Sequence, residues 1–196
     1  MAATALDQAL AFLVEADRLK SVERQTWLTD GSRQENSAEH SWHAALTAMV
    51  LAPFASEPVQ VDRAIRMLLL HDLVEIDAGD TFLYDAVASA DQAQRECAAA
   101  DRLFGLLPVE QSLADRALWD EFEAGQTPDA RFAKAVDRVN PVLLNLATQG
   151  KGWRVHGVRL EQVLARNAGI AGPLPAVWAW LRSRLEQAVE AGWLRP

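Results

Sequence analysis

Apolar residues recur every three or four positions along most of the chain, which is the spacing of amphipathic α-helices. No stretch alternates between apolar and polar residues in the way that would predict a β-strand. The pattern predicts helices over about residues 5–20, 36–52, 61–77, 89–105, 109–124, 128–149, 160–167 and 175–191. We therefore expect an all-α protein.

Polar and helix-breaking residues mark the ends of several of these helices. Asn36, followed three residues later by Glu39, forms a capping-box pair at the start of the second helix. Residues 21–35 are expected to be irregular, and residues 81–88 to form a loop or a short helix. We find no internal repeat and no linker long enough to divide the chain, so residues 1–196 are expected to form one domain.

The composition is that of a soluble globular protein, with 50% hydrophobic and 23% charged residues. The single cysteine, Cys97, excludes an intramolecular disulfide and fits a reducing compartment. The N-terminus lacks the basic start and compact apolar core of a signal peptide, and no apolar stretch reaches membrane-spanning length. A cytoplasmic protein without a membrane partner is expected.

The formal net charge is −8 and the chain has no basic run, which argues against binding along a nucleic-acid backbone. A small anionic ligand is compatible with this charge, provided that a metal ion and a few arginines supply local positive charge. The expected partner is therefore a small molecule and not a nucleic-acid polymer.

One predicted helix carries a histidine and two carboxylates in a run of leucines, in the segment LLLHDLVEI of residues 68–76. Buried polar groups cost free energy unless something pairs with them, so three of them together need a common explanation. On an α-helix Asp72 lies about 100° and Glu75 about 40° from His71, so all three project into one sector. Imidazole and carboxylate groups are ordinary ligands of divalent transition metals, which makes this sector a candidate metal site. A salt-bridged or solvated helix face is the alternative.

Further ligands would have to come from other helices. His40 and His43 are three residues apart on the second helix and share a face, although a hydrogen-bonded core histidine is the alternative for either. The residues alone do not choose among the later carboxylates, which include Glu121, Glu123, Asp129 and Asp137. One local feature favours Asp137, because Pro141 lacks the N–H that would bond the carbonyl of residue 137 and the helix is expected to distort there.

Three sequence blocks occur in an order that resembles a known family. They are RQENSAEH (residues 33–40), HDLVEIDAGD (residues 71–80) and ARFAKAVDR (residues 130–138). This order resembles the H…HD…D pattern of the HD-domain metal-dependent phosphohydrolases, and most nearly their 5′-deoxynucleotidase-like branch. The resemblance covers about residues 13–146 and implies a single-domain HD-type helical bundle, with the C-terminal helices packed on that core.

The resemblance implies one divalent metal ion, held by His40, His71, Asp72 and Asp137. The ion would be Mn, Co, Fe, Ni or Zn, with Mg as a further alternative. Glu75 and Asp80 would flank the reacting phosphate and move protons during hydrolysis. From the residues alone, capping of the turn after Gly79 is the alternative for Asp80, and the two roles are compatible.

The same resemblance implies two substrate contacts in the segment before the second helix. Arg24 would bind the phosphate, since a guanidinium suits forked phosphate contacts. Trp27 would stack on the sugar or base, with ordinary core packing as the alternative. Gln25 and Thr26 separate the two residues here, whereas some family members have them adjacent.

These features predict a metal-dependent phosphohydrolase that removes phosphate from (deoxy)nucleoside 5′-monophosphates by attack of a metal-bound water. The resemblance also implies a homodimer. Two alternatives stay open: an HD hydrolase for another phosphate ester, and a non-catalytic nucleotide-binding regulatory module. The role of His43 is open, and the glycine-containing segment 150–157 around His156 is expected to be a solvated connector, with a lid or a dimer contact as alternatives.

Overall fold

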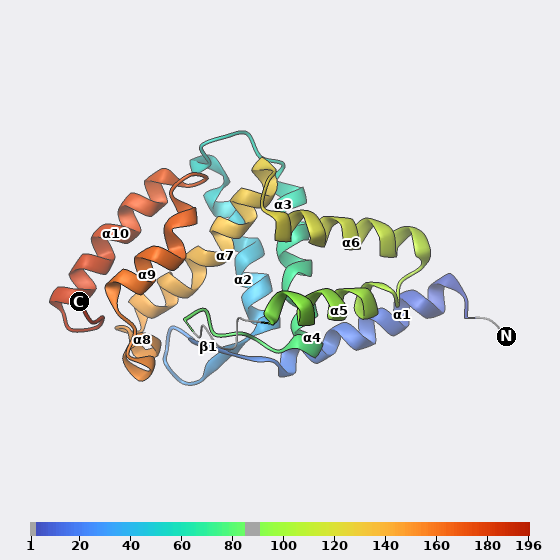
Figure 1. Ribbon diagram of the computed structural model, residues 1–196, viewed down its shortest axis with the longest axis horizontal. Coiled ribbons are helices and arrows are strands. Elements are labelled where there is room, and N and C mark those ends of the chain that lie inside the picture. The colour runs from blue at the N-terminus through green and yellow to red at the C-terminus, as the bar shows by residue number, and fades with distance from the viewer. Residues whose placement is uncertain (1–2, 85–90) are drawn as a thin grey trace.

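The computed structural model describes residues 3–84 and 91–196, and this part of the chain is almost entirely helical (Figure 1). Its α-helices are α1 (Ala5–Ala16), α2 (Ser37–Leu51), α3 (Val61–Leu70), α4 (Glu75–Ala78), α5 (Gln92–Phe104), α6 (Val109–Ala124), α7 (Pro128–Ala147), α8 (Lys151–His156), α9 (Leu160–Asn167) and α10 (Pro175–Glu190). The all-α class predicted from the sequence is confirmed. No helix in the described ranges is both long and apolar enough to cross a membrane.

The helix α7 is the centre of the larger apolar core. Its inward side chains, Phe132 and Val136 among them, are buried where α7 packs on α2, α3, α6 and the C-terminal helices. Pro128 occupies the start of α7, as predicted, because its missing N–H is not needed there. The helix continues through Pro141, so residues on either side of this proline share one rigid element.

A second apolar cluster joins α5, α6 and the 3₁₀ turn that follows α3. Leu73 and Val74 of this turn pack with Leu103, Phe104 and Trp119. The residues at the end of α3 belong to the first core instead. The polar side chains of the turn therefore lie at the junction of two apolar clusters, which fixes their position.

The helix predicted over residues 61–77 is interrupted at the candidate metal residues. The chain passes from α3 into a 3₁₀ turn before α4 begins. The ring of His71 hydrogen-bonds the carbonyl of Leu68, and the indole of Trp119 donates to the carbonyl of His71. The prediction of one continuous helix was wrong because the spacing of apolar residues cannot reveal these hydrogen bonds between side chains and backbone.

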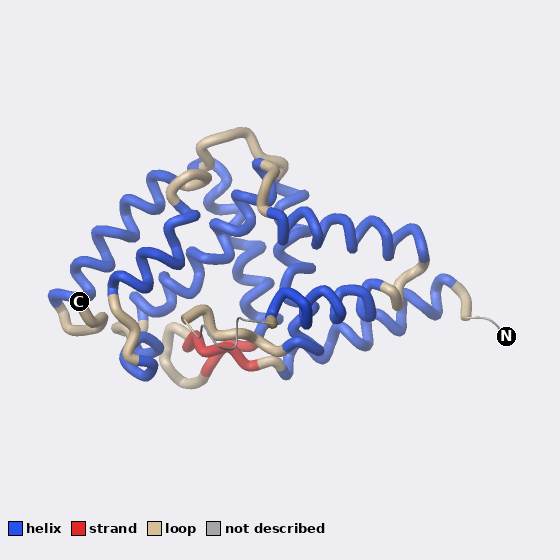
Figure 2. The backbone as a smooth tube through the Cα atoms, viewed as in Figure 1, coloured by secondary structure: helices blue, strands red, loops and turns tan. Residues whose placement is uncertain are grey.

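A two-stranded antiparallel hairpin replaces the irregular segment predicted before α2 (Figure 2). Its strands are β1 (Glu23–Trp27) and β2 (Gln34–Asn36). Both strands are short and mostly polar, so no alternation marks them in the sequence, and the prediction was wrong at this point. The capping box of Asn36 and Glu39 is confirmed, so β2 leads directly into α2.

The segment 150–157 forms the helix α8, and the prediction of a solvated connector was wrong. Gly150 and Gly157 flank α8 with φ of 70° and 65°, so these glycines mark helix ends and not a loop. Trp153 between them is buried, and α8 packs on β1. Trp153 is part of the larger apolar core, and the sequence pattern did not reveal the hairpin on which α8 packs.

The remaining helices follow their predictions closely. The bounds of α6 and α9 are as predicted, and α10 ends one residue early. Residues 89–90, predicted to begin α5, lie outside the described part of the chain, as do residues 85–88 of the predicted loop. The helix α1 ends at Ala16 and continues as a 3₁₀ turn.

Candidate active site and metal centre

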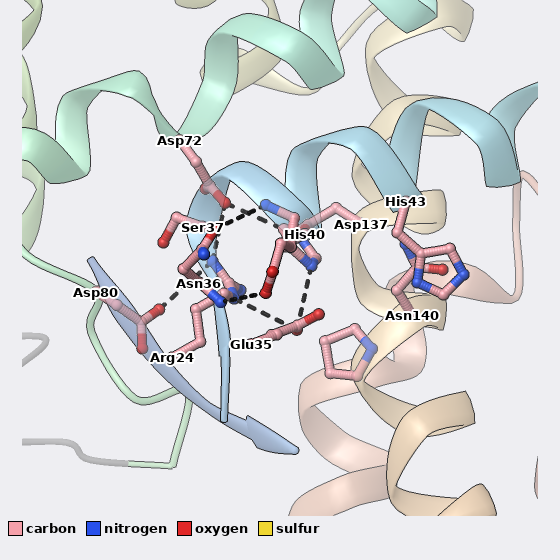
Figure 3. A network of polar contacts seen from close by, with 12 residues as sticks. Arg24, Glu35, Asn36, Ser37, His40, His43, Asp72, Asp80, Asp137 and Asn140 are labelled. Atoms are coloured by element: carbon pink, nitrogen blue, oxygen red, sulfur yellow. Dashed lines mark hydrogen bonds and ion pairs between the residues drawn. The ribbon is translucent and has the colours of Figure 1, made fainter. Parts of the chain in front are cut away.

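Four predicted residues from three elements converge at one point. His40 of α2 places its Nε2 2.9 Å from Asp137 Oδ1 of α7 and 3.9 Å from Asp72 Oδ2. His71 of the 3₁₀ turn places its Nε2 3.0 Å from Asp72 Oδ1 and 3.5 Å from Asp137 Oδ1. His40, Asp72 and Asp137 face one another in Figure 3. Both histidines and Asp72 are buried, and each offers a ligand atom within 4.8 Å of the other two.

The hydrogen bonding of His71 fits a bound cation. Its Nδ1 lies 2.7 Å from the carbonyl oxygen of Leu68, which can only accept, so Nδ1 carries the proton. In the neutral ring, the lone pair of Nε2 then points at the carboxylates of Asp72 and Asp137. This buried nitrogen has no hydrogen-bond partner within residues 3–84 and 91–196. A lone pair aimed at carboxylate oxygens is repulsive unless a positive charge lies between them; a proton supplies it in the metal-free protein, and a divalent ion would supply it in place of that proton.

The balance of charge also fits a cation. The guanidinium of Arg24 faces four carboxylates, those of Glu35, Asp72, Glu75 and Asp80. Its Nη1 lies 2.8 Å from Asp72 Oδ2, 3.4 Å from Glu75 Oε1 and 3.5 Å from Asp80 Oδ1. Asp137 adds a further negative charge beside His40. One guanidinium does not neutralise this cluster, and imidazole with carboxylate is a donor set that suits Mn, Fe, Co, Ni or Zn.

The buried carboxyl groups divide into two kinds by pKa. Without a metal ion, Asp72 and Asp137 outweigh burial and raise the pKa of His71 well above its usual value. Burial opposes ionisation of Asp72, but the resulting positive charge of His71 and that of Arg24 lower the pKa of Asp72 to about 2. Burial likewise opposes ionisation of Asp137, yet the hydrogen bond with His40 and the positive charge of both histidines hold its pKa well below the usual value. In contrast, burial and the charge of Asp72 raise the pKa of Glu75 to about 8. The site thus contains permanent anions beside a group that can exchange protons near neutrality.

Glu75 is held from two sides. The hydroxyl of Ser37, the first residue of α2, donates to Glu75 Oε2 at 2.5 Å, and Arg24 Nη1 donates to Oε1 at 3.4 Å. Asp80 follows Gly79, whose φ of 74° turns the chain at the end of α4, and burial raises the pKa of Asp80. The predicted proton-transfer residues are therefore both near Arg24 and adjacent to the candidate metal ligands.

A cavity of about 270 Å³ opens from this polar cluster. Its lining includes Arg24, His71, Asp72, Glu75, Asp80 and Asp137. The rest of its wall includes aromatic and amide side chains, among them Phe82, Tyr84, Asn145, Trp153 and Asn167. A cavity that contains a guanidinium and candidate metal ligands together with aromatic and amide side chains is suited to a phosphate attached to a ring system.

Two predicted site residues do not line this cavity: His40, which is fully buried, and Trp27. The ring of Trp27 lies under the ammonium of Lys151, 3.5 Å from Nζ to the ring centroid, in a separate surface groove with Arg33. Its neighbours Gln25 and Thr26 line the cavity instead. Stacking of Trp27 on substrate therefore stays a prediction.

Three further titratable residues, His43, Asp77 and His156, lie apart from the cluster. His43 is partly exposed, and its ring stacks on Trp42 with centroids 6.0 Å apart. Asp77 accepts a hydrogen bond at 2.8 Å from Arg102 Nη2, which ties α4 to α5. His156 of α8 contacts the amide oxygen of Gln25 at 3.0 Å.

Sequence reasoning missed Glu35 and Ser37, although both lie in the block 33–40, because neither forms a recognisable ligand pattern.

A family model for the HD domain matches residues 16–178. In a solved structure, a predicted metal-dependent phosphohydrolase from Magnetospirillum magnetotacticum MS-1 is 49% identical to this chain with a TM-score of 0.93. That similarity covers 98% of this chain and 96% of the other. The cyanophage S-2L HD phosphohydrolase, solved with dA and one catalytic Zn²⁺ ion, is 20% identical with a TM-score of 0.54 over 91% of this chain and 96% of its own, a likeness of fold alone.

Curated relatives named 5′-deoxynucleotidase HDDC2 match a shorter region. The proteins from Xenopus laevis and Homo sapiens are each 30% identical over 135 residues, which is 68% of this chain. The match spans 66% and 65% of these relatives, just under two thirds of their own length. With the family model matching most of its length, the chain belongs to the HD domain family.

Proposed function

We propose that this protein is a metal-dependent phosphomonoesterase that removes phosphate from (deoxy)nucleoside 5′-monophosphates. The observation that carries the proposal is the continuity of the buried His-Asp cluster with Arg24, Glu75 and a cavity of mixed aromatic and amide character. The curated relatives named 5′-deoxynucleotidase support it. So does the cyanophage relative, whose structure contains a deoxyadenosine-type ligand, dA, and Zn²⁺.

The metal would be a single divalent ion held by His40, His71, Asp72 and Asp137. Such an ion supplies positive charge that polarises a phosphoryl group and lowers the pKa of water. Without that charge the acidic cluster would repel an anionic substrate. The donor set favours a transition metal but does not select one element among them.

The side chains around the metal position would bind the phosphate and move protons. Arg24 provides the guanidinium that receives the phosphate oxygens, with its orientation set by the surrounding carboxylates. Glu75, oriented by Ser37, exchanges a proton with the attacking water or with the leaving oxygen, and Asp80 stands beside it. Hydrolysis forms one P–O bond from water and breaks the P–O bond to the nucleoside, which leaves as the alcohol. The aromatic wall of the cavity would hold the base and sugar.

A substrate screen tests this proposal directly. Purified protein is first stripped of metal with a chelator and then reloaded with Mn²⁺, Co²⁺ or Mg²⁺. We expect phosphate release from 5′-monophosphates, little from the matching 3′-monophosphates, and none from the stripped protein. Release from generic esters but not from nucleotides would favour a hydrolase for another phosphate ester. Nucleotide binding with no phosphate release in any metal-loaded sample would favour the regulatory module.

We also infer a homodimer that forms through the outer face of α2. Trp42, Leu46, Met49 and Val50 lie on one face of this helix and are 64%, 42%, 59% and 59% exposed. Exposed apolar residues that share one helix face mark a candidate interaction surface. Phe54 follows directly after α2 and is also exposed.

Charged substitutions on this face are expected to convert the dimer to a monomer. Introducing Leu46→Glu together with Met49→Glu would place two charges in an apolar interface, where they cannot be solvated. Light scattering coupled to size-exclusion chromatography measures the mass. Leu113→Glu, an equally drastic change at an exposed leucine of α6, is the matched control and is expected to remain dimeric. A monomeric wild-type protein would contradict the inference.

A further inference from the structure

A carboxylate oxygen, a guanidinium nitrogen and an imidazole nitrogen, all three buried, lie close together beside the candidate metal site. Glu35 Oε1 lies 3.8 Å from Arg24 Nε and 3.7 Å from His40 Nδ1. None of these three atoms has a hydrogen-bond partner in the described part of the chain. Glu35 itself is only 2% exposed. Figure 3 shows it below His40 and beside Arg24, with dashed lines to both.

The contact with His40 bears on the metal ligand. The Nε2 atom of His40 faces Asp137 and the candidate metal position, so ligation through Nε2 requires the proton to be on Nδ1. A protonated Nδ1 needs an acceptor, and a carboxylate is a common one for a ligating histidine. For His71 the carbonyl of Leu68 has this role, at 2.7 Å from Nδ1. Glu35 is the group placed to act in the same way for His40.

The contact with Arg24 bears on the phosphate-binding group. The Nη1 atom of Arg24 is directed at Asp72, Glu75 and Asp80, on the side where a phosphate would enter. The Nε atom, on the other edge of the planar guanidinium, faces Glu35. A negative charge at that edge resists displacement of the guanidinium when a phosphate draws it forward. Glu35 therefore holds the guanidinium of Arg24 in place through its Nε edge.

The hairpin explains why one residue reaches both partners. Arg24 lies in β1 and Glu35 in β2, and the register pairs Glu23 with Asn36 at this end of the hairpin. Asn36 then caps α2, so His40 follows Glu35 by little more than one helical turn. A single short segment thus fixes the positions of Glu35, Arg24 and His40 relative to one another.

We propose that Glu35 is a positioning residue that holds His40 ready for metal binding and Arg24 ready for phosphate binding, and so links the two events. The inference rests on the proposed function, because it assigns His40 to the metal and Arg24 to the phosphate. It predicts that removing the charge of Glu35 weakens both kinds of binding at once.

The test compares Glu35→Gln, Glu35→Asp and Glu23→Gln. The glutamine variant keeps the shape and removes the charge, and the aspartate variant keeps the charge on a shorter stem. Glu23, an exposed carboxylate on the paired strand, provides the matched control. Calorimetric titration of Mn²⁺ into stripped protein gives the metal affinity, and steady-state kinetics at saturating Mn²⁺ give kcat and KM for a deoxynucleoside 5′-monophosphate.

We expect Glu35→Gln to weaken Mn²⁺ binding by about 10- to 100-fold, the usual effect of losing the carboxylate behind a ligating histidine. At saturating metal its KM should rise more than its kcat falls, because Arg24 is less well oriented. Glu35→Asp should recover part of both losses, and Glu23→Gln should stay within twofold of wild type. A folded Glu35→Gln protein with wild-type metal affinity and KM would overturn the inference.

A measurement on the wild type keeps the inference testable even if the variants do not fold. In Zn²⁺-loaded protein labelled with ¹⁵N at histidine, the ring of His40 should show a protonated, hydrogen-bonded Nδ1 and a ligating Nε2. An unprotonated Nδ1 at His40 would overturn the assignment. Wild-type protein that neither binds metal nor releases phosphate would instead refute the proposed function, so the two failures are distinguishable.

Discussion

Replacing Asp72 with alanine is expected to abolish metal binding and phosphatase activity. Asp72 contributes one oxygen 3.0 Å from His71 Nε2 and the other 2.8 Å from Arg24 Nη1. Its removal therefore takes away a ligand and also releases the guanidinium that faces the phosphate. Loss of a supporting group near a metal already costs about 10- to 100-fold in affinity, and loss of a direct ligand is expected to exceed that range.

Elemental analysis of the metal and a phosphate-release assay measure this result. Thermal unfolding provides a third readout, because a ligand that binds only the native state raises its Tm. Mn²⁺ should raise the Tm of the wild type and leave that of Asp72→Ala unchanged. Asp77→Ala is the matched control, since Asp77 belongs to the same segment but pairs with Arg102 on α5. Full metal occupancy in Asp72→Ala would remove Asp72 from the ligand set.

The second large effect is expected at Glu75. Glu75→Ala should lose turnover by about 10²- to 10⁴-fold, the range typical of a lost proton-transfer group. Metal stoichiometry and substrate affinity should stay close to wild type, because Glu75 is oriented by Ser37 and Arg24 and is not placed among the four candidate ligands. The burial that raises the pKa of Glu75 to about 8 is consistent with a group that holds a proton and does not bind metal.

Steady-state kinetics together with equilibrium binding of a deoxynucleoside 5′-monophosphate separate these effects. Glu75→Gln, which keeps the shape of the side chain, should be as inactive as Glu75→Ala if proton transfer is the role. Recovery of turnover in the glutamine variant would assign Glu75 to orientation of Arg24 instead. Turnover near the wild-type level in both variants would remove Glu75 from the mechanism.

The sequence by itself determined the helical class and much of the helix layout. The bounds of α6 and α9 and the capping box before α2 were all predictable, because amphipathic spacing and capping are local properties of a few successive residues. It also identified His40, His71 and Asp72 as candidates through the cost of burying polar groups in apolar helices. Asp137 needed the family resemblance, since Pro141 was the one local feature that favoured it and this did not choose it among the other carboxylates.

Only the tertiary structure decided how these residues meet. The 3₁₀ turn at His71 accepts a hydrogen bond from Trp119 of another helix, and α8 packs on the hairpin. The hairpin has strands too short for a pattern to mark, yet it sets Arg24 against Glu35 and leads into α2. It also leaves Trp27 outside the cavity. Such contacts join residues that are far apart in the chain, so the spacing of neighbouring residues cannot predict them. These same contacts determine which polar side chains share one buried site.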